Sequence, residues 1–173
     1  MKQTIKTLLI IIVVGILGFL SYRVVQTINY KKEVAEHLET MPDFAFTNIA
    51  TDQPFTNTEL APSTPTIFIY FNSTCDFCQH EAKGIQEQID LFSDVQIVFV
   101  SEQEKEEIEA FSRNYQLNNL PNVFFVQDEN DLFSKQFDAT SIPYLIIYNK
   151  NNQLLTANKG QLKPEAIHQL IYE

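Results

Sequence analysis

The sequence predicts an α/β fold built around a central mixed sheet, preceded by an N-terminal transmembrane helix. Short apolar runs of strand length alternate along the chain with segments whose apolar residues recur at helical spacing. Among the 173 residues, 45% are aliphatic or aromatic, including 14 Phe and 7 Tyr. One domain of ordinary size, with helices packed in layers on a sheet, can therefore fill its core.

The N-terminus carries a long apolar segment behind Lys2 and Lys6. The unbroken run at 8–20 is too short, at about 1.5 Å per residue, for a hydrocarbon core of roughly 30 Å, but residues 5–25 are long enough. No small-x-small cleavage site follows, which favours an uncleaved signal anchor at 1–25 over a removed signal peptide. Short N-terminal anchors of this kind usually leave the large C-terminal part outside the cell membrane. We therefore expect a single-pass protein whose C-terminal part is extracytoplasmic, on the periplasmic side.

A connecting segment separates the anchor from the globular part. Residues 23–40 contain no Gly or Pro and place apolar residues at roughly helical spacing, so residues 26–40 form either a helical stalk or a loosely ordered linker. The stretch Met41-Pro42-Asp43 breaks this pattern. The domain is therefore expected at residues 41–173.

The strands are identified from apolar runs between turn-forming residues. TIFIYF at 66–71 follows a Pro-rich loop, and VQIVFV at 95–100 is equally apolar, so both are expected to be buried in the sheet. A turn at 149–152 joins two runs that pair as a hairpin. In order, the expected strands are 44–49, one around Phe55, 66–71, 95–100, 123–126, 144–148 and 153–157.

The helices follow from residues spaced three or four apart. From Cys78 onwards, Ala82, Ile85, Ile89 and Phe92 recur at this spacing, and the first turn of their helix holds the cysteines. Segment 102–115 is charged with a few apolar residues, which predicts an amphipathic helix whose acids form a solvated face. The expected helices are 78–92, 102–115, 132–137 and one that begins at Pro164, a residue suited to the first helical position.

The charge excludes one class of partner. With 22 acidic residues against 12 Lys and Arg, the formal net charge is −10. A chain of this charge is repelled by a phosphate backbone, so we expect no nucleic-acid partner.

The two cysteines, Cys75 and Cys78, stand in the order strand, CxxC, helix. Structural zinc needs four ligands, and no second CxxC or H-x3-H pair completes the set. A disulfide between residues three apart closes a very small loop and adds little stability. A dithiol at a helix N-terminus is different, because the helix dipole favours a thiolate that can attack a partner's disulfide. The context therefore favours a reactive dithiol.

Three stretches of the chain resemble parts of one known family. The first, PDFAFTNIATDQPFT, resembles its opening hairpin, and the second, TIFIYFNSTCDFCQHEA, resembles its strand with CxxC and a following acid. The third, TSIPYLIIYNKNNQLL, resembles its Pro-led strand and hairpin. Together they resemble the thioredoxin superfamily, and more closely its membrane-anchored TlpA/ResA-like thiol-disulfide oxidoreductases, which border on the AhpC/TSA group. The resemblance covers residues 42–172. It implies a thioredoxin-like three-layer fold, with residues 102–130 as the helix and strand that this branch inserts.

The resemblance also implies the site residues. Cys75 would be the exposed nucleophile and Cys78 the buried resolving thiol, and their redox-active disulfide would need no other cofactor and no metal. Glu81, in the pattern C-x-x-C-x-x-E, would adjust thiol pKa values and move protons, although the helix dipole alone also favours an acid there. Pro143 would be the cis-proline, and Ile142 before it would offer its backbone to a bound substrate chain.

Two departures from the family pattern affect the chemistry. Ile69 stands where thioredoxins often have a buried acid, so Glu81 is the only acid near the dithiol that can serve as an internal base. Asp76 follows Cys75 directly, and its carboxylate should oppose ionisation of that thiol. This favours the disulfide over the dithiolate and predicts a reductant.

Three rival functions follow from related folds. A peroxiredoxin has its peroxide-reducing cysteine in a Pro-x-x-x-Thr-x-x-Cys loop, whereas Asn72 stands three residues before Cys75. Copper-delivery proteins use CxxxC with a distant His, and His80 is too close to the CxxC in sequence to be that ligand. A redox-inactive interaction module tethered to a membrane complex is the third alternative, and retention of both cysteines weighs against it.

The sequence thus predicts a membrane-anchored extracytoplasmic thiol-disulfide oxidoreductase. Its substrates would be proteins that bear a disulfide or a thiol, and its direction would be reductive. In a compartment that oxidises thiols, electrons must come from elsewhere, and a membrane thiol carrier is the expected donor. Cytochrome c maturation is a common task in the family that the chain resembles.

Overall fold

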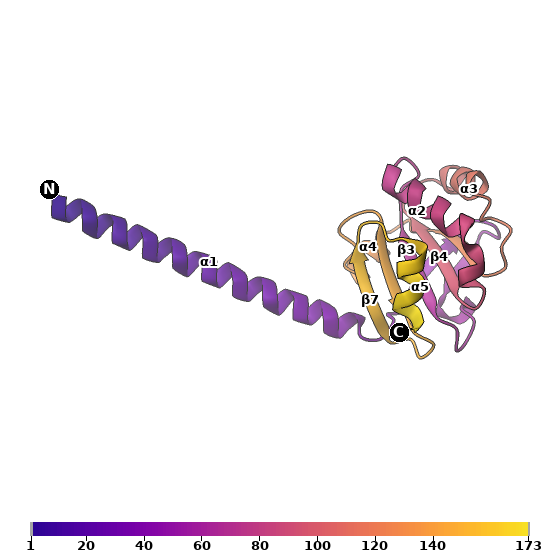
Figure 1. The fold of residues 1–173 in the computed structure, drawn as a ribbon, viewed down its shortest axis with the longest axis horizontal. Coiled ribbons are helices and arrows are strands. Elements are labelled where there is room, and N and C mark those ends of the chain that lie inside the picture. Colours follow the sequence, from indigo (N-terminus) through magenta and orange to yellow (C-terminus); the bar gives the residue numbers. More distant parts are fainter. Residues whose placement is uncertain (1, 173) are drawn as a thin grey trace. The chain divides into compact units, whose positions relative to one another are not determined.

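The computed structural model describes residues 2–172 and divides the chain into a unit that ends at His37 and a unit that begins at Leu38 (Figure 1). Helix α1, Lys2–Leu38, runs without a break through the expected anchor and stalk, so the stalk is helical. Among the described residues, no helix combines the length and the apolar character needed to cross a membrane. The side chains at 2–11, 13 and 14, where much of the expected span falls, lie outside the described part.

The second unit is built on a seven-stranded mixed sheet with the order β2-β1-β5-β4-β3-β6-β7. Strands β3, β4 and β5 are parallel, and the other neighbouring pairs are antiparallel. All seven expected strands are confirmed, and none of the expected bounds is wrong by more than two residues. Their bounds are β1 Ala45–Asn48, β2 Gln53–Thr56, β3 Thr66–Tyr70, β4 Gln96–Ser101, β5 Val123–Gln127, β6 Tyr144–Tyr148 and β7 Leu154–Lys159.

The four expected helices of this unit are also confirmed. The first of them changes to a 3-10 turn after Gln88, whose backbone leaves the helical region at φ −125° and ψ 33°. The helices are α2 Asp76–Glu87, α3 Lys105–Asn114, α4 Leu132–Gln136 and α5 Pro164–Tyr172, and the 3-10 turns are η1 Asn57–Glu59 and η2 Ile89–Phe92.

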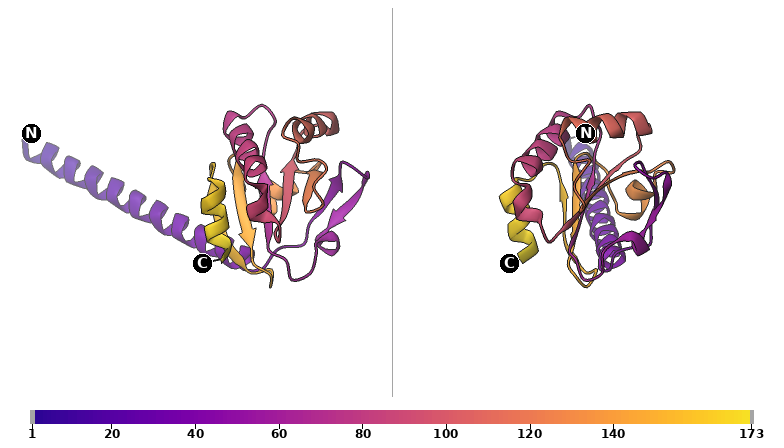
Figure 2. Two further views of the ribbon diagram at one scale, coloured as in Figure 1. Left: turned by 45° about the vertical axis from the view of Figure 1, so that its right-hand side comes forward. Right: turned by 90° about the vertical axis from the view of Figure 1, so that its right-hand side faces the viewer.

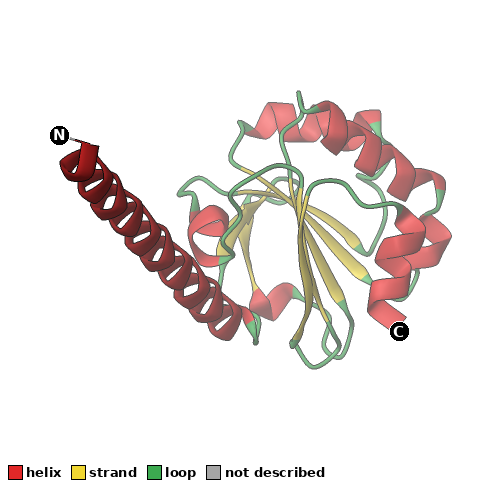
Figure 3. Cartoon of the chain, turned by 60° about the vertical axis from the view of Figure 1, so that its left-hand side comes forward, coloured by secondary structure: helices red, strands yellow, loops and turns green. Residues whose placement is uncertain are grey.

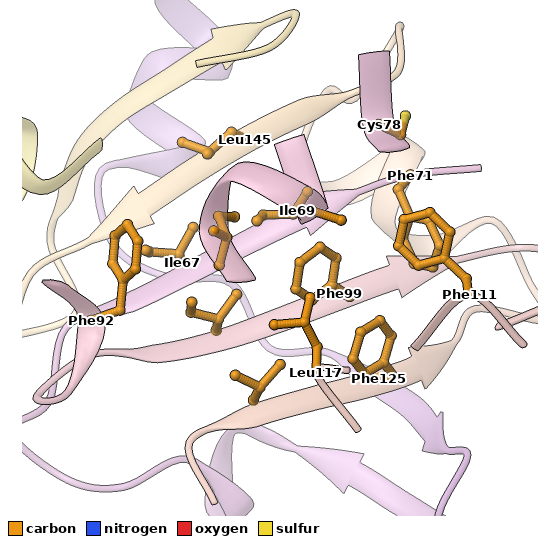
Figure 4. Close-up of a cluster of buried hydrophobic side chains, with 14 of the residues drawn as sticks. Ile67, Ile69, Phe71, Cys78, Phe92, Phe99, Phe111, Leu117, Phe125 and Leu145 are labelled. Carbon is orange, nitrogen blue, oxygen red and sulfur yellow. The ribbon is translucent and has the colours of Figure 1, made fainter. Parts of the chain in front are cut away.

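Side chains that alternate along β3 separate two cores, and helices lie on both sides of the strands (Figure 3). Ile67 and Ile69 face the larger core, with buried side chains from α2, α3 and α5. Figure 4 shows this cluster, in which the ring of Phe71 lies against that of Phe111 of α3. Their centroids are 4.4 Å apart. Phe68 faces the other side, where its ring lies 5.5 Å from that of Phe137, just after α4. The chain therefore forms the three layers that the resemblance implied.

Helix α5 packs beside α2 on one face of the sheet (Figure 2). The approach is close at Gly84, where a Cβ would lie 3.3 Å from Pro164 Cγ. Because Gly84 has no side chain, the start of α5 and the loop that leads into it can lie directly against α2. This contact brings the loop after β7 to the helix that carries the CxxC.

The strand register brings several loops to one edge of the sheet. Tyr70 at the end of β3 pairs with Val100 near the end of β4 and with Tyr144 at the start of β6. The residues after β3 must therefore lie beside those after β4 and those before β6. In open α/β sheets this carboxyl edge is where ligands and reactive groups gather.

Candidate functional site

Cys75 stands at the end of the loop between β3 and α2. It is the N-cap residue of α2, with φ −82° and ψ 116°. The sequence had suggested a position inside the first turn, but Cys75 lies one residue before it. Its carbonyl oxygen accepts the first helical hydrogen bond from Gln79 N–H, at 3.0 Å. The side chain is partly exposed and its thiol is free. A thiolate here would face the unpaired N–H groups and the positive end of the dipole of α2.

Cys78 lies in the first turn of α2 and is almost completely buried, with 2% of its surface exposed. Figure 4 places its sulfur at the edge of the larger core, above Phe71. Burial raises the pKa of the Cys78 thiol well above its ordinary value, and its interaction with the Cys75 thiol raises it further. The second thiol is therefore held protonated and protected while the first is accessible.

Glu81 follows Cys78 by one helical turn and points inward, with only 1% of its surface exposed. Its Oε1 accepts a hydrogen bond from Leu162 N–H at 3.0 Å, while Oε2 has no hydrogen-bond partner among the described residues. Burial raises the pKa of Glu81 to about 7, and the bond from Leu162 opposes this shift. A carboxyl group with such a pKa exchanges its proton near neutral pH, as a general base for a buried thiol requires.

The peptide bond between Ile142 and Pro143 is cis, in agreement with the resemblance. Pro143 is buried directly before β6, whereas Ile142 is 40% exposed. Phe77, in the first turn of α2, is 65% exposed although it is a large apolar residue. Both exposed side chains border a groove of about 490 Å³, which the loop after β7 completes. An exposed groove with apolar side chains at its border, two residues along the chain from Cys75, suits a bound polypeptide segment.

The loop between β7 and α5 contains functional contacts that sequence reasoning missed. Gly160 N–H donates to the Pro143 carbonyl oxygen at 2.8 Å, and two residues later Leu162 N–H donates to Glu81. Gly160 has φ +94°, a conformation that side chains strongly disfavour. The only signal in the sequence was a glycine after a strand, which indicates a turn but does not reveal what the turn touches.

In residues 2–172 as described, no group of three or more His, Cys, Asp and Glu side chains is placed to hold a metal ion. His80 is exposed on α2, whereas Cys78 and Glu81 of the same helix are buried.

Residues 38–157 match the model of the AhpC/TSA family, and this range is more than half of the chain. The chain belongs to the AhpC/TSA family. The predicted membership of the thioredoxin superfamily is thus confirmed. In this AhpC/TSA protein, the strand register and the packing of α5 bring all five predicted site residues to one edge of the sheet: Cys75, Cys78, Glu81, Ile142 and Pro143.

Solved structures with a thioredoxin-like fold are similar to this AhpC/TSA protein. A secreted disulfide oxidoreductase of Mycobacterium tuberculosis, homologous to DsbE of E. coli, shares 16% identity at a TM-score of 0.63, over 78% of this chain and 96% of the other. A thioredoxin-like protein from Aeropyrum pernix shares 16% identity at a TM-score of 0.62, over 84% of this chain and 96% of the other. StoA from Bacillus subtilis shares 19% identity at a TM-score of 0.59, over 76% of this chain and 98% of the other. At these identities the likeness shows the fold. No curated protein sequence matches the chain.

Proposed function

We propose that the protein is a thiol-disulfide oxidoreductase that reduces disulfides of partner proteins. The observation that carries the proposal is the arrangement of Cys75, Cys78 and Glu81 along one helix. An accessible thiol caps the helix, a protected thiol follows one turn later, and a buried carboxyl group with a pKa of about 7 follows after another turn. A structural pair of cysteines would need neither the difference in exposure nor the buried acid.

In the first step the Cys75 thiolate attacks one sulfur of the partner's disulfide. The partner's S–S bond breaks, a mixed disulfide forms between Cys75 and the partner, and the second partner sulfur leaves as a thiolate that takes up a proton. The N-cap position of Cys75 favours its thiolate, which is the attacking species.

In the second step Cys78 resolves the mixed disulfide. Its raised pKa means that the thiol must lose a proton as it reacts, and the Glu81 carboxylate, one turn away, accepts that proton. The Cys78 sulfur attacks the Cys75 sulfur, the bond to the partner breaks, and the partner's remaining sulfur leaves as a thiolate and is protonated. The partner gains two electrons and two protons, and the protein ends with a Cys75–Cys78 disulfide.

The groove would hold the partner's chain during these steps. Phe77 and Ile142 offer exposed apolar surface on two of its sides. Ile142, directly before the cis-proline, would pair through its backbone with the extended segment that carries the partner's cysteine.

The reductive direction is proposed from charge. Asp76 is exposed in the first turn of α2, next to Cys75, and its carboxylate opposes formation of a second negative charge there. The disulfide is thereby favoured over the dithiolate, so the reduced protein tends to give its electrons away. A membrane thiol carrier would return the protein to the dithiol, and reduction of the cysteines used in cytochrome c maturation is a candidate task.

The reduction potential of the Cys75–Cys78 couple tests this proposal. We expect the full-length protein in detergent, equilibrated with defined thiol buffers and analysed by alkylation and mass spectrometry, to give a value near or below about −270 mV. A value near about −120 mV would instead describe an oxidant that introduces disulfides. A pair that does not cycle at all would leave a tethered interaction module as the function.

The variant Asp76→Asn tests the origin of the potential. Removal of an exposed charge beside the thiol should raise the potential by an amount on the order of 10 mV, since such surface interactions are weak. Asp90→Asn is the matched control, because Asp90 is also exposed but lies after α2. Equal potentials for Asp76→Asn and the unmodified protein would refute the role of Asp76.

We also propose that residues 5–25 anchor the protein in the cell membrane and leave the domain on the extracytoplasmic side. The support is the apolar composition of this segment behind Lys2 and Lys6. The full chain should remain with the membrane after an alkaline carbonate wash, and a protease added from outside should digest the domain. Release of the chain by the wash would contradict anchoring in the membrane. Protection of the domain from the protease would contradict the extracytoplasmic orientation.

A further inference from the structure

The turn that carries Cys75 begins at Asn72, whose side chain folds back on the residues that follow. Asn72 Oδ1 accepts hydrogen bonds from Thr74 N–H at 2.9 Å and from Thr74 Oγ1 at 2.7 Å. The Asn72 carbonyl oxygen accepts one from Cys75 N–H at 3.1 Å. These local bonds shape the turn, but they do not fix it relative to the rest of the domain.

Ser73, in the middle of the turn, is bound from two sides by glutamine side chains. Its N–H donates to Gln103 Oε1 at 2.5 Å, and its Oγ accepts a hydrogen bond from Gln103 Nε2 at 2.9 Å. Its carbonyl oxygen accepts a hydrogen bond from Gln79 Nε2 at 2.8 Å. Gln79 belongs to α2 and ties the turn to its own helix. Gln103 lies thirty residues away in sequence, in the loop between β4 and α3, and connects the turn to that loop.

Gln103 is itself held firmly. It lies between β4 and α3, and its Nε2 also donates to Glu107 Oε1 at 3.0 Å. Its carbonyl oxygen accepts a hydrogen bond from Gln127 Nε2, at the end of β5, at 3.0 Å. Because β3, β4 and β5 are parallel and adjacent, all three segments meet at the same edge of the sheet. The amide of Gln103 therefore has a fixed position from which to hold Ser73.

Packing does not replace these bonds on the side of α3. A hollow of about 240 Å³ lies there, and Ser73, Gln79, Glu107 and Phe111 are among the residues that border it. A turn beside a hollow has few van der Waals contacts to resist displacement. On this side the hydrogen bonds from Gln103 and Gln79 therefore hold Ser73 where packing is sparse.

The position of the turn matters for the chemistry at Cys75. The field of a helix terminus acts on a charge only within the first turn, so a small displacement of the N-cap residue changes how strongly a thiolate is stabilised. We propose that Gln103 is a positioning residue that holds the turn at 72–75 and thereby sets the reactivity of the Cys75 thiol. The proposal rests on the proposed function to the extent that Cys75 is the attacking thiol.

The pH profile of Cys75 alkylation tests the proposal. In the reduced full-length protein, Gln103→Ala should lower the rate with iodoacetamide at pH 7 about three- to ten-fold, the effect expected for the loss of hydrogen bonds that hold a reactive group. The pH of half-maximal rate should move upwards while the plateau at high pH is unchanged. Ser73→Ala, which removes only the bond to the hydroxyl group, should give a smaller shift in the same direction.

Two controls separate positioning from a loss of structure. Gln127→Ala removes one bond that holds the segment of Gln103 but leaves both bonds from Gln103 to Ser73, so its shift should be clearly smaller than that of Gln103→Ala. Alkylation of buried Cys78 reports general loosening, and it should stay as slow as before. If Gln103→Ala does not fold, Gln103→Met keeps the aliphatic bulk and removes both bonds to Ser73.

An unchanged half-maximal pH in Gln103→Ala or Gln103→Met would overturn the proposal, as would an equal shift in Gln127→Ala. Alkylation requires no partner protein. Failure of the oxidoreductase function would therefore be seen in the reduction potential, separately from the result for Gln103.

Discussion

The variant Cys78→Ser should accumulate covalent complexes with partner proteins, joined through Cys75. The first step needs only the accessible thiol at the N-cap, while release of the partner needs the buried thiol one turn later. Without Cys78 the mixed disulfide has no internal resolving group, and steady-state reduction of a protein disulfide should fall to the background of the thiol buffer. The complexes are measured on non-reducing gels and assigned by mass spectrometry of the linked peptides.

Cys75→Ser is the matched control for this trapping experiment. The residue remains an N-cap of similar size, but the nucleophile is lost, so neither turnover nor covalent complexes are expected. Complexes that form through Cys78 in this variant would show that the assignment of the two thiols is reversed. Equal amounts of complex in both single variants would argue against a defined order of attack.

The variant Glu81→Gln should remove a pH dependence of stability. The pKa of Glu81 is about 7 in the folded protein and 4.5 when unperturbed, so between these values the folded state binds the proton more strongly than the unfolded state. The contribution of Glu81 to the free energy of unfolding is therefore zero below about pH 4.5 and becomes increasingly unfavourable as the pH rises to 7. At 1.36 kcal/mol per pH unit, the full cost above pH 7 is about 3 kcal/mol.

A glutamine keeps the acceptor for Leu162 N–H but cannot ionise. Urea unfolding of the reduced proteins at pH 5 to 8 should show the unmodified protein losing stability, relative to Glu81→Gln, as the pH rises. The gain of the variant at pH 8 should be about 3 kcal/mol, less the cost of burying the amide. Glu87→Gln, an exposed position on the same helix, is the control and should parallel the unmodified protein.

The same variant should slow the second chemical step. Without a carboxylate to accept the proton of Cys78, release of a model partner from the mixed disulfide should become slower near pH 7, by a factor of about 10² for a general base. Addition of the partner to Cys75 should be unaffected. Normal release by the variant would show that Glu81 is only a buried acid near the helix N-terminus. An unchanged pH dependence of stability would contradict its raised pKa.

The elements of the domain were predictable because their signals are local. The runs at β3 and β4 are apolar on both faces of the sheet, and the residues Ala82 and Ile85 face the core from α2 at regular spacing. The exact start of α2 was not predictable from the sequence. Moving Cys75 by one residue, from the first turn to the N-cap, leaves the apolar periodicity unchanged.

The site was predictable only where a local motif marks it, at the CxxC with its following acid and at Ile142 and Pro143 before a strand. Cys78 and Glu81 lie on the buried face of α2, whereas Cys75 precedes the helix as its N-cap and is partly exposed. The contacts of Gly160, Leu162 and Gln103 depend on loops that meet after the sheet has formed. No spacing in the sequence encodes which backbone N–H reaches a carboxylate eighty-one residues away.

The short segment from Gly160 to Leu162 joins the groove beside the cis-proline to the buried carboxyl group of Glu81. One end donates to the carbonyl oxygen of Pro143 in the groove, and the other donates to Glu81 behind the dithiol. Because the bond from Leu162 lowers the pKa of Glu81, a displacement of this segment that lengthened the bond would make the carboxylate a stronger base. The groove and the proposed proton acceptor therefore share one short backbone segment.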